Sequence, residues 1–446
     1  MTTLEELLAG WLPQQRWYGS KGRPVTGLVA HRGEPLTGAH GRLLPLLVQV
    51  TFGDGGPEET YQVPVALRPE PWEDIAHSLL GQVDGEFVYD APHDPDAAAL
   101  LLSALHDQTR AGQVSFHRIA EINTDLRPRL VGAEQSNTSL VYGEQLILKL
   151  FRRIAPGLNP DLELTRALQA AGSVHVAAVH GWIETEIDGQ EATLGVLQAF
   201  ARSATEGWKL AQASVRDLYA EADLHADEVG GDFAGESHRL GSATADVHAL
   251  LAQALPTRVA DRAEAAATAQ QMHDRLDYAA AEIPALAEHA GTLHAAFAQV
   301  AGREGVPTQR IHGDYHLGQV LRTDTGWLLL DFEGEPARPL AERTALMSPI
   351  RDVAGMLRSF DYAARSLLAD HPYEPGLEYR AGEWAERNRT AFCEGYAAVT
   401  GRDPREDEVL LRAFELDKAV YEVIYEARHR PSWLSIPLGS IQRLAA

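Results

Sequence analysis

The fold is decided by two runs of sequence, His312-Gly313-Asp314-Tyr315-His316-Leu317-Gly318-Gln319 and, after a short turn, Leu328-Leu329-Leu330-Asp331-Phe332-Glu333. Phosphoryl transfer asks a protein mainly to place the nucleophile in line and to neutralise negative charge with metal ions. A carboxylate, an amide oxygen five residues later and a second carboxylate at a strand end supply those groups. We therefore predict an ATP-dependent kinase in which Asp314 is the catalytic base, while Gln319 and Asp331 hold Mg²⁺.

The spacing between the two runs supports this prediction geometrically. Protein kinases use the pattern His-Arg-Asp-x-x-x-x-Asn with a later Asp-Phe-Gly, so Gln319 takes the place of their Asn and Asp331 that of their second Asp. A four-residue turn at 323–326 predicts a hairpin in which residue 322 pairs with 327 and residue 319 with 330. Gln319 and Asp331 then lie at the same open end, where hard oxygen ligands can share magnesium ions. A lone His-Gly-Asp would be an ordinary turn, but this combination is much more specific.

A lysine upstream is the candidate for the phosphates of ATP. The predicted strand over 142–151 carries Lys149 on the same face as Ile147 and Phe151. A lysine on a half-apolar face indicates a side chain that points into a cleft. Glu163, at the start of the next predicted helix, is its expected acidic partner. The alternative is an edge-strand lysine that points to water.

Two further segments are candidates for nucleotide binding. In the loop at 132–139, Ser136, Asn137 and Thr138 can offer hydroxyl, amide and backbone donors to phosphate oxygens. The alternative is an ordinary hairpin turn. The adenine is expected near Gln198 and Phe200, where the chain would cross between two lobes.

Three compositional zones predict the domain organisation, with boundaries near residues 90 and 200. Residues 1–90 are predicted to form a small α+β unit of short strands, and residues 91–200 a second mixed unit whose first helix is capped near Asp94. Residues 201–446 are predicted to form long helices that the hairpin interrupts. A β-rich lobe followed by a mostly α-helical lobe is typical of kinases, so the predicted fold class is α+β, bilobal and protein-kinase-like.

Composition narrows the range of partners. The chain has 446 residues and a net charge of −24, which repels nucleic acid and anionic membranes, so we expect neither as a partner. The single cysteine, Cys393, excludes an intrachain disulfide and fits a reducing cytosol. No secretory signal or membrane span is recognisable. We expect a cytoplasmic monomer that acts on a small molecule.

Several segments resemble those of bacterial maltokinases, which are relatives of the aminoglycoside phosphotransferases. The more specific ones are Pro13-Gln14-Gln15-Arg16-Trp17-Tyr18-Gly19 and Tyr425-Glu426-Ala427-Arg428-His429-Arg430-Pro431. The others are 132–139, 148–153, 312–319, 331–336, 348–356 and 417–422, so the resemblance covers most of the chain. It implies transfer of the γ-phosphate of ATP to the anomeric hydroxyl of maltose, and the product, maltose 1-phosphate, feeds α-glucan (glycogen) synthesis. It also implies that residues 1–90 form an N-terminal cap subdomain on an ATP-binding N-lobe, 91–200, with the sugar site in the C-lobe, 201–446.

A disaccharide needs hydrogen-bonding groups and an aromatic platform. The helical zone offers these candidates for contacts with the sugar: His316, Arg351, Tyr362, Glu422, Glu426 and Trp433. Glu422 and Glu426 would share one helical face. The alternative is a solvated helix face with Tyr421 and Tyr425 packed beneath it. Asp352 is interpreted as a structural residue that holds the catalytic loop by hydrogen bonds.

Other functions fit the same residues. A glucosamine kinase, or another sugar or aminoglycoside kinase, would use the same scaffold, and Glu422 and Glu426 could then provide an acidic pocket for a cationic amine. A catalytically inactive sugar or nucleotide sensor is the alternative from another class, although every expected catalytic position is filled. For the cap, the open roles are regulation, association with a partner enzyme such as a trehalose synthase, and stabilisation of the lobe.

Overall fold

The computed structural model describes residues 3–132, 136–221, 224–335, 338–369 and 374–445. The chain divides into two compact units. Unit 1 comprises Met1–Arg166 and Ala177–Arg202, and unit 2 comprises Ala167–Val176 and Ser203–Ala446. In the part of the chain that the structure describes, no helix combines the length and apolar character needed to cross a membrane. The predicted three-part division with boundaries near 90 and 200 stays a prediction.

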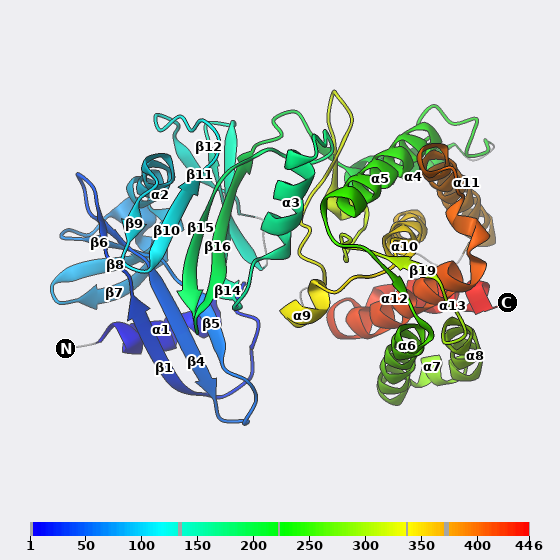
Figure 1. Ribbon diagram of the computed structural model, residues 1–446, viewed down its shortest axis with the longest axis horizontal. Helices are drawn as coiled ribbons and strands as arrows, with labels where there is room; N and C mark the ends of the chain where they lie inside the picture. The colour runs from blue at the N-terminus through cyan, green and yellow to red at the C-terminus, as the bar shows by residue number, and fades with distance from the viewer. Residues whose placement is uncertain (1–2, 133–135, 222–223, 336–337, 370–373, 446) are drawn as a thin grey trace. The chain divides into compact units, whose positions relative to one another are not determined.

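Unit 1 is built on three antiparallel sheets, whose strands run from blue to green in Figure 1. The first sheet has the order β1 (Val25–Arg32), β4 (Leu46–Phe52), β5 (Glu59–Gln62), β14 (Arg153–Ile154). The second has the order β2 (Leu36–Thr37), β3 (Arg42–Leu44), β6 (Val65–Arg68), β8 (Glu86–Asp90), β7 (Leu79–Val83). The third has the order β11 (Pro128–Leu130), β12 (Asn137–Tyr142), β13 (Leu146–Phe151), β16 (Gln190–Ala199), β15 (Val179–Ile187), β10 (Val114–Arg118), β9 (Arg110–Ala111).

The helices of unit 1 are short, and two of them, α1 and α2, are capped by side chains at their N-termini. They are α1 (Leu4–Trp11), η1 (Leu12–Gln14), η2 (Glu73–Ser78), η3 (Ala91–His93), α2 (Pro95–Asp107) and α3 (Pro160–Ala170), which extends past Arg166 into the segment assigned to unit 2. Thr3 and Glu6 form a capping box at the start of α1. As expected, Asp94 caps α2, because its carboxylate accepts hydrogen bonds from the backbone N–H groups of Asp96 and Ala97.

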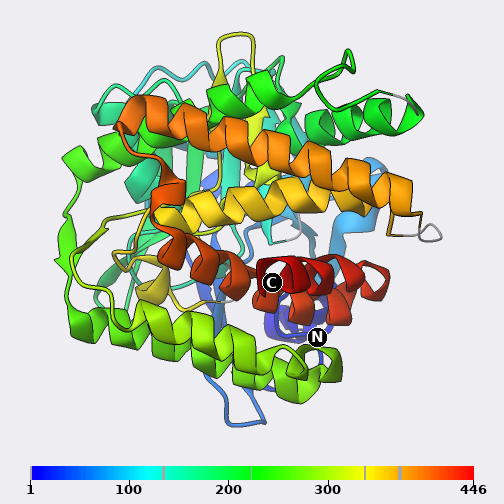
Figure 2. The same cartoon turned by 90° about the vertical axis from the view of Figure 1, so that its right-hand side faces the viewer.

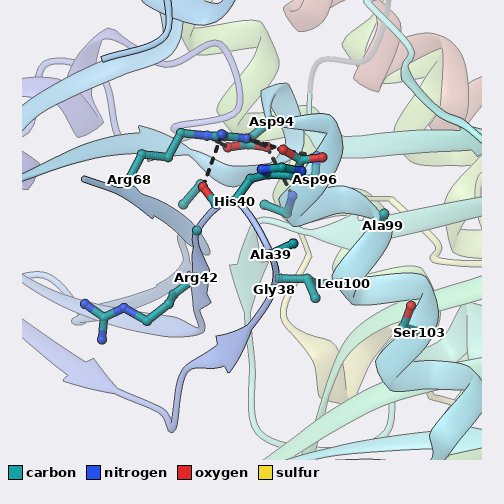
Figure 3. A pocket seen from close by; sticks show the side chains of 13 residues that line it. Gly38, Ala39, His40, Arg42, Arg68, Asp94, Asp96, Ala99, Leu100 and Ser103 are labelled. Atoms are coloured by element: carbon teal, nitrogen blue, oxygen red, sulfur yellow. Dashed lines mark hydrogen bonds and ion pairs between the residues drawn. The ribbon is translucent and has the colours of Figure 1, made fainter. Parts of the chain in front are cut away.

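The Asp94 cap is held by an arginine from the second sheet (Figure 3). The Arg68 guanidinium donates to both Asp94 carboxylate oxygens, at 2.6 and 2.8 Å, and to the Asp96 carboxylate at 2.7 Å. Arg68 also donates to the backbone carbonyl of His40. This bidentate pair fixes the start of α2 against β6.

Two hydrophobic cores join the sheets of unit 1. In β4, Leu46, Val48, Val50 and Phe52 alternate inward and pack with α1. The second core extends from Leu43 and Tyr89, through α2, into the seven-stranded sheet. A short ladder adds to this continuity, since Arg153 and Ile154 of β14 pair with Tyr61 and Thr60 of β5. The N-terminal half of unit 1 is therefore continuous with the seven-stranded sheet.

Unit 2 is mostly helical, as expected. Its helices are α4 (Gly207–Ala220), α5 (Ala234–Ala254), α6 (Arg262–Glu282), α7 (Pro284–Ala287), α8 (Ala290–Val300), α9 (Leu340–Arg343), α10 (Ile350–Ser366), α11 (Pro375–Thr400), α12 (Glu408–His429) and α13 (Ser435–Ala445), with η4 (Leu317–Gln319), η5 (Pro404–Glu406) and η6 (Pro431–Trp433). Its short strands are β17 (Thr205–Glu206), β18 (Arg258–Ala260), β19 (Val306–Thr308), β20 (Val320–Arg322) and β21 (Trp327–Leu329).

Helix α10 forms the centre of unit 2. Figure 2 shows it in yellow between α11 in orange and α12 in red, and every residue from Asp352 to Ser366 is buried. Beside it, α5 and α11 approach so closely that a side chain at Gly241 would collide with the carbonyl oxygen of Phe392. Burial on all sides makes α10 a rigid support for the loop that precedes β20.

Candidate active site

The hairpin of unit 2 has the predicted register. Val320, Leu321 and Arg322 pair with Leu329, Leu328 and Trp327, and the Leu330 N–H donates to the Gln319 carbonyl at 2.9 Å. Gln319 and Asp331 therefore lie at the same open end of the hairpin. Asp331 has a φ of 57°, in the left-handed region that an aspartate seldom adopts. An unusual backbone conformation at this carboxylate fits a functional position.

The loop before the hairpin is held by Asp352 of α10. This carboxylate accepts hydrogen bonds from the backbone N–H groups of His312, at 2.7 Å, and Gly313, at 2.9 Å. His248 Nε2 donates to it from α5 at 3.1 Å. Burial alone would raise the pKa of Asp352, but the bond from His248 and the nearby charges hold it below its usual range. The interpretation of Asp352 as the structural support of this loop is confirmed.

The carboxylate of Asp314 is paired with a lysine that sequence reasoning did not assign. Lys418 of α12 donates to Asp314 Oδ1 at 3.0 Å and to Glu335 Oε1 at 3.1 Å. Burial would raise the pKa of Asp314, but the Lys418 ammonium lowers it below its usual value. Burial would likewise lower the pKa of Lys418, but Asp314 and Glu335 raise it above its usual value. Asp314 is thus an anion held in a fixed position.

Glu335 is the second residue that sequence reasoning missed here. It accepts hydrogen bonds from Arg338 and, at 3.4 Å, from Arg351. Burial would raise its pKa, but Lys418, Arg351 and Arg338 together lower it well below the usual range. Arg351, a sugar candidate, therefore contacts a carboxylate of the protein and lines the same pocket as Asp314.

The pocket around Asp314 is balanced in charge. Its ionisable lining consists of four carboxylates and four basic groups: Asp314, Glu335, Asp352 and Asp417 with Arg275, Arg338, Arg351 and Lys418. Arg275 and Asp417 form a bidentate pair at 2.8 and 2.6 Å. The pocket therefore has no excess of negative charge among its lining residues.

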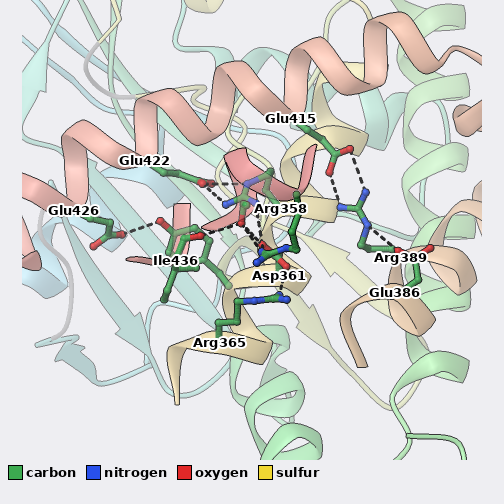
Figure 4. Close-up of polar contacts among 12 residues, drawn as sticks. Arg358, Asp361, Arg365, Glu386, Arg389, Glu415, Glu422, Glu426 and Ile436 are labelled. Atoms are coloured by element: carbon green, nitrogen blue, oxygen red, sulfur yellow. Dashed lines mark hydrogen bonds and ion pairs between the residues drawn. The ribbon is translucent and has the colours of Figure 1, made fainter. Parts of the chain in front are cut away.

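Three of the predicted sugar residues meet at the end of α12. Glu426, labelled in Figure 4, lies on α12. It accepts a hydrogen bond from Tyr362 at 3.3 Å and two from Arg430, at 2.7 and 2.9 Å. The ring centroids of Trp433 and Tyr362 are 6.5 Å apart. The Arg430 guanidinium lies over the Trp433 ring, 4.3 Å from its centroid. A platform of aromatic rings with a fixed carboxylate is thus present, although it is not the pocket that contains Asp314.

Glu422 is tied to a different arginine (Figure 4). It accepts from Arg358 Nε at 3.1 Å and Nη2 at 2.6 Å. Burial raises the pKa of Glu422 in spite of that pairing. The alternative of a solvated face is wrong, because Glu426 is 1% exposed while Tyr425 is 37% exposed. Each of the two carboxylates is paired with its own arginine, and the acidic pocket that they could offer a cationic amine stays a prediction.

A row of rings on α12 was not predicted as part of the site. Tyr421 and Tyr425 stack with centroids 6.4 Å apart, and Tyr425 stacks on His429 at 4.5 Å. Tyr421 lines the pocket of Asp314, and the Lys418 ammonium lies 4.8 Å from its ring centroid. The spacing of four residues is visible in the sequence, where Tyr421 and Tyr425 enter only in the alternative of a solvated face with both rings packed beneath it.

His316 takes the position beside Asp314 that its place in the sequence indicates. Its Nδ1 accepts a hydrogen bond from the Gly318 N–H at 3.0 Å, which closes the turn leading to Gln319. Burial lowers the pKa of His316 to about 4, so the ring is neutral near pH 7. Its predicted contact with a sugar stays a prediction.

In unit 1, Lys149 lies on a central strand. β13 runs between β12 and β16, and Lys149 is only 9% exposed, so the edge-strand alternative is wrong. Its Nζ is 3.6 Å from Asp161 Oδ2, at the start of α3. Asp161 is thus an acidic neighbour that sequence reasoning missed, whereas the partnership with Glu163 stays a prediction.

The expectation for Thr138 needs a correction. Ser139 is paired with Lys149 and therefore shares its face, whereas Thr138 is paired with Leu150 on the opposite face. The Thr138 hydroxyl accepts a hydrogen bond from Arg152 at 2.8 Å. Alternation along β12 thus turns the Thr138 side chain away from Lys149.

The other nucleotide candidates of unit 1 are placed but not tested. Ser136 is exposed just before β12, and Asn137 is the first residue of that strand; residues 133–135 of the same loop lie outside the described residues. Gln198 pairs with Ile147 near the end of β16, and the Phe200 N–H donates to the Gln145 carbonyl at 2.8 Å. Their roles toward phosphate and adenine stay predictions.

Comparison with known proteins relates both units to phosphotransferases. Residues 11–94 match a family model described as the maltokinase N-terminal cap domain, and residues 125–401 match one described as the phosphotransferase enzyme family. The chain is 30% identical over 316 residues to a glucosamine kinase of Streptacidiphilus jiangxiensis, covering 68% of this chain and 70% of that protein. It is 26% identical over 391 residues to a glucosamine kinase of Mycolicibacterium smegmatis, covering 85% of this chain and 95% of that protein.

Solved structures share the fold. A glucosamine kinase in complex with glucosamine, ADP and inorganic phosphate matches with a TM-score of 0.72 and 24% identity over 99% of each chain. A second crystal form of a glucosamine kinase matches with a TM-score of 0.75 and 23% identity, again over 99% of each chain. The predicted kinase-like fold, with a β-rich N-terminal part and a helical C-terminal part, is confirmed.

Proposed function

This chain belongs to the phosphotransferase enzyme family, and we propose that it transfers the γ-phosphate of ATP to the anomeric hydroxyl of maltose. The products would be ADP and maltose 1-phosphate, a precursor for α-glucan (glycogen) synthesis. The observation that carries this proposal is the pocket of Asp314, which is neutral on balance and is lined by Tyr421, the first ring of the aromatic row of α12.

The proposed acceptor is uncharged because the pocket offers no excess of negative charge. An ammonium group would need an unpaired carboxylate to replace its hydration. Asp314 is paired with Lys418, Glu335 with three basic groups, and Asp417 with Arg275. Hydroxyl groups of a neutral sugar can exchange hydrogen bonds with such pairs without adding a charge.

The proposed acceptor has more than one ring because the aromatic row is long. Tyr421, Tyr425 and His429 are each four residues apart, so the row extends along about 12 Å of α12. Stacked rings offer flat apolar faces to the apolar faces of sugar rings. A glucose unit at Asp314 would leave the rest of the row to a second unit.

The reaction follows from the state of Asp314. In the proposed complex, the anomeric hydroxyl donates a hydrogen bond to Asp314, and its oxygen attacks the γ-phosphorus in line with the departing ADP oxygen. The proton passes to Asp314, the new oxygen–phosphorus bond forms, and the bond to ADP breaks. Because its pKa lies below the usual range, Asp314 is a weak base that chiefly orients the hydroxyl, which suits a loose transition state.

Residues of both units supply the proposed roles in binding ATP and Mg²⁺. Lys149 would contact the phosphates of ATP. Gln319 and Asp331 offer an amide and a carboxylate oxygen at one end of the hairpin, a donor set that fits Mg²⁺. When bound, Mg²⁺ would neutralise the negative charge of the phosphates.

We further propose that the protein is a cytoplasmic monomer that can associate with a trehalose synthase. Co-elution of the two purified proteins would test this association.

The second candidate is a glucosamine kinase, which the two curated relatives favour. Release of ADP by the purified protein with ATP and Mg²⁺ separates the candidates when maltose, glucose, glucosamine and kanamycin are compared. Turnover confined to maltose, with an acid-labile phosphate as product, supports the proposal. Faster turnover of glucosamine would mean that glucosamine, and not maltose, is the acceptor. ADP release that depends on either sugar excludes an inactive sensor.

A further inference from the structure

A cavity of about 430 Å³ lies within unit 1, apart from the residues proposed for phosphoryl transfer. Its wall is formed by parts of the first two sheets, helix α2, and strands β10, β15 and β16 of the seven-stranded sheet. The apolar lining includes Leu43, Leu46, Leu101, Val114, Ile183 and Leu194, all of them buried. The volume falls in the range of about 300–1,000 Å³ that small-molecule sites occupy.

One buried polar atom faces this cavity without a partner. Thr185 lines the cavity and is 4% exposed, and its Oγ1 has no hydrogen-bond partner among the described residues. It follows Ile183 by two positions on β15, so both side chains lie on the same face of the strand. Buried hydroxyls in folded proteins are normally hydrogen-bonded, so a lone one in a cavity indicates a missing partner.

The charged groups of the cavity are confined to its mouth. His31, Arg32 and Glu34 line it and are exposed, and Arg32 lies 3.7 Å from the carboxylate of Glu5. The buried part contains apolar side chains, Thr185 and Gln62, and no charged residue. A charged group of a ligand would lose its hydration there without gaining a partner.

We propose that this cavity binds a small, uncharged and mostly apolar molecule whose single hydrogen-bonding group pairs with Thr185. The apolar lining supplies affinity by removing the ligand's surface from water. The hydroxyl of Thr185 supplies orientation, because it is the lone unpaired side-chain group at the buried wall of the described cavity.

The test titrates the full chain with N-phenyl-1-naphthylamine, an uncharged fluorescent molecule with apolar rings and one N–H. Fluorescence should rise in a saturable, one-to-one manner. Replacing Thr185 with Val keeps the side chain's shape and should weaken binding about threefold to tenfold, the range expected for loss of one neutral hydrogen bond. Leu101→Trp fills the cavity and should abolish saturable binding.

The adjacent residue on α2 provides the matched control. Leu100 lines a different pocket, beside Gly38 (Figure 3), so Leu100→Trp should bind the probe with a dissociation constant within about twofold of the unmodified chain's, because no contact with the probe changes. Val114→Phe fills the cavity from β10 and replaces Leu101→Trp as the filled variant if Leu101→Trp does not fold. Absence of saturable binding to the unmodified chain overturns the proposal. Binding that survives in a folded filled variant, or that is unchanged in Thr185→Val, overturns it as well.

Discussion

Lys418 Nζ lies 3.0 Å from Asp314 Oδ1, although the two residues are 104 positions apart in the sequence. Asp314 follows the loop that Asp352 anchors, and Lys418 comes from the buried face of α12. The proposed catalytic carboxylate is therefore supported from two independent directions.

Replacing Asp314 with Asn should lower kcat by about 10²–10⁴-fold, because the amide cannot accept the proton of the attacking hydroxyl. Nucleotide binding should change little, since Asp314 is not assigned to ATP. ADP release and a nucleotide-binding titration measure the two effects. Asp324→Asn, in the exposed turn of the hairpin, is the matched control and should retain activity. An Asp314→Asn variant with most of its turnover would refute the role.

Replacing Lys418 with Met should shift the acid limb of the kcat/KM profile to higher pH. The lysine charge lowers the pKa of Asp314, so its removal raises that pKa, and protonation then inactivates the enzyme at a higher pH. Lys418→Arg keeps the charge and should keep most of the profile. A profile that is the same for Met and for the unmodified chain would show that Lys418 does not act through charge.

Stability should fall as the pH drops below about 4.5, the usual pKa of a glutamate. The pKa of Glu335 is lowered in the folded protein, so its contribution is present above the unfolded pKa and is lost as pH falls toward the folded one. One such group gives a slope of about 1.4 kcal/mol per pH unit. Urea unfolding from pH 3 to pH 7 should show a smaller slope for Glu335→Gln. Glu288→Gln, an exposed control, should leave the slope unchanged.

Replacing Tyr425 with Ala should raise the KM for maltose about threefold to tenfold, as expected for loss of one stacking partner. The KM for glucose should change less, because a single ring would lie at Asp314. Tyr425 is exposed, so thermal stability should be maintained. Tyr379→Ala, another exposed tyrosine on α11, serves as the control for steady-state kinetics. Equal effects on both sugars would argue against a second ring on the row.

Replacing Arg152 with Met should lower the free energy of unfolding by about 3 kcal/mol, because the buried Asp90 carboxylate would lose its partner. Arg152 is 1% exposed, and its Nη2 lies 3.0 Å from Asp90 Oδ2. Adding Asp90→Asn should recover part of the loss, since the unpaired charge is then removed. Urea unfolding of the two variants checks this. A loss of about 1 kcal/mol or less, typical of exposed pairs, would contradict it.

The sequence predicted the parts of the site that depend on short-range spacing. A four-residue turn fixes which residues of a hairpin face each other, so the relation of Gln319 to Asp331 could be predicted from residues 319–331 alone. The structural role of Asp352 was expected, but its hydrogen bonds to the backbone of His312 and Gly313 depend on how α10 packs against the loop. The pairing of Lys418 with Asp314 could not be predicted, because it depends on how α12 packs in unit 2.

The side chains of Thr138 and Glu422 differ from expectation for two separate physical reasons. Thr138 and Ser139 are both hydroxyl residues, so composition does not reveal which of them shares the face of Lys149; only the strand register decides. Glu422 and Glu426 lie on one face as expected, but their arginine partners make them parts of ion pairs. For Glu422 that partner is Arg358, 64 positions away on α10. That long-range pair leaves no local signal, whereas Arg430 lies four positions from Glu426 and could have been anticipated.

The pairing of β14 with β5 has a consequence for exchanging parts between relatives. Residues 153–154, directly after the lysine strand, complete the sheet that begins with β1, and Arg152 spans Thr138 and Asp90. A chimera joined at residue 94, where the cap match ends, would place a foreign sheet edge against a native β14. A chimera joined at residue 202, after β16, would keep the β5–β14 pairing and the whole seven-stranded sheet from one parent. The cap and the lysine strand are therefore one structural module, even though separate family models describe them.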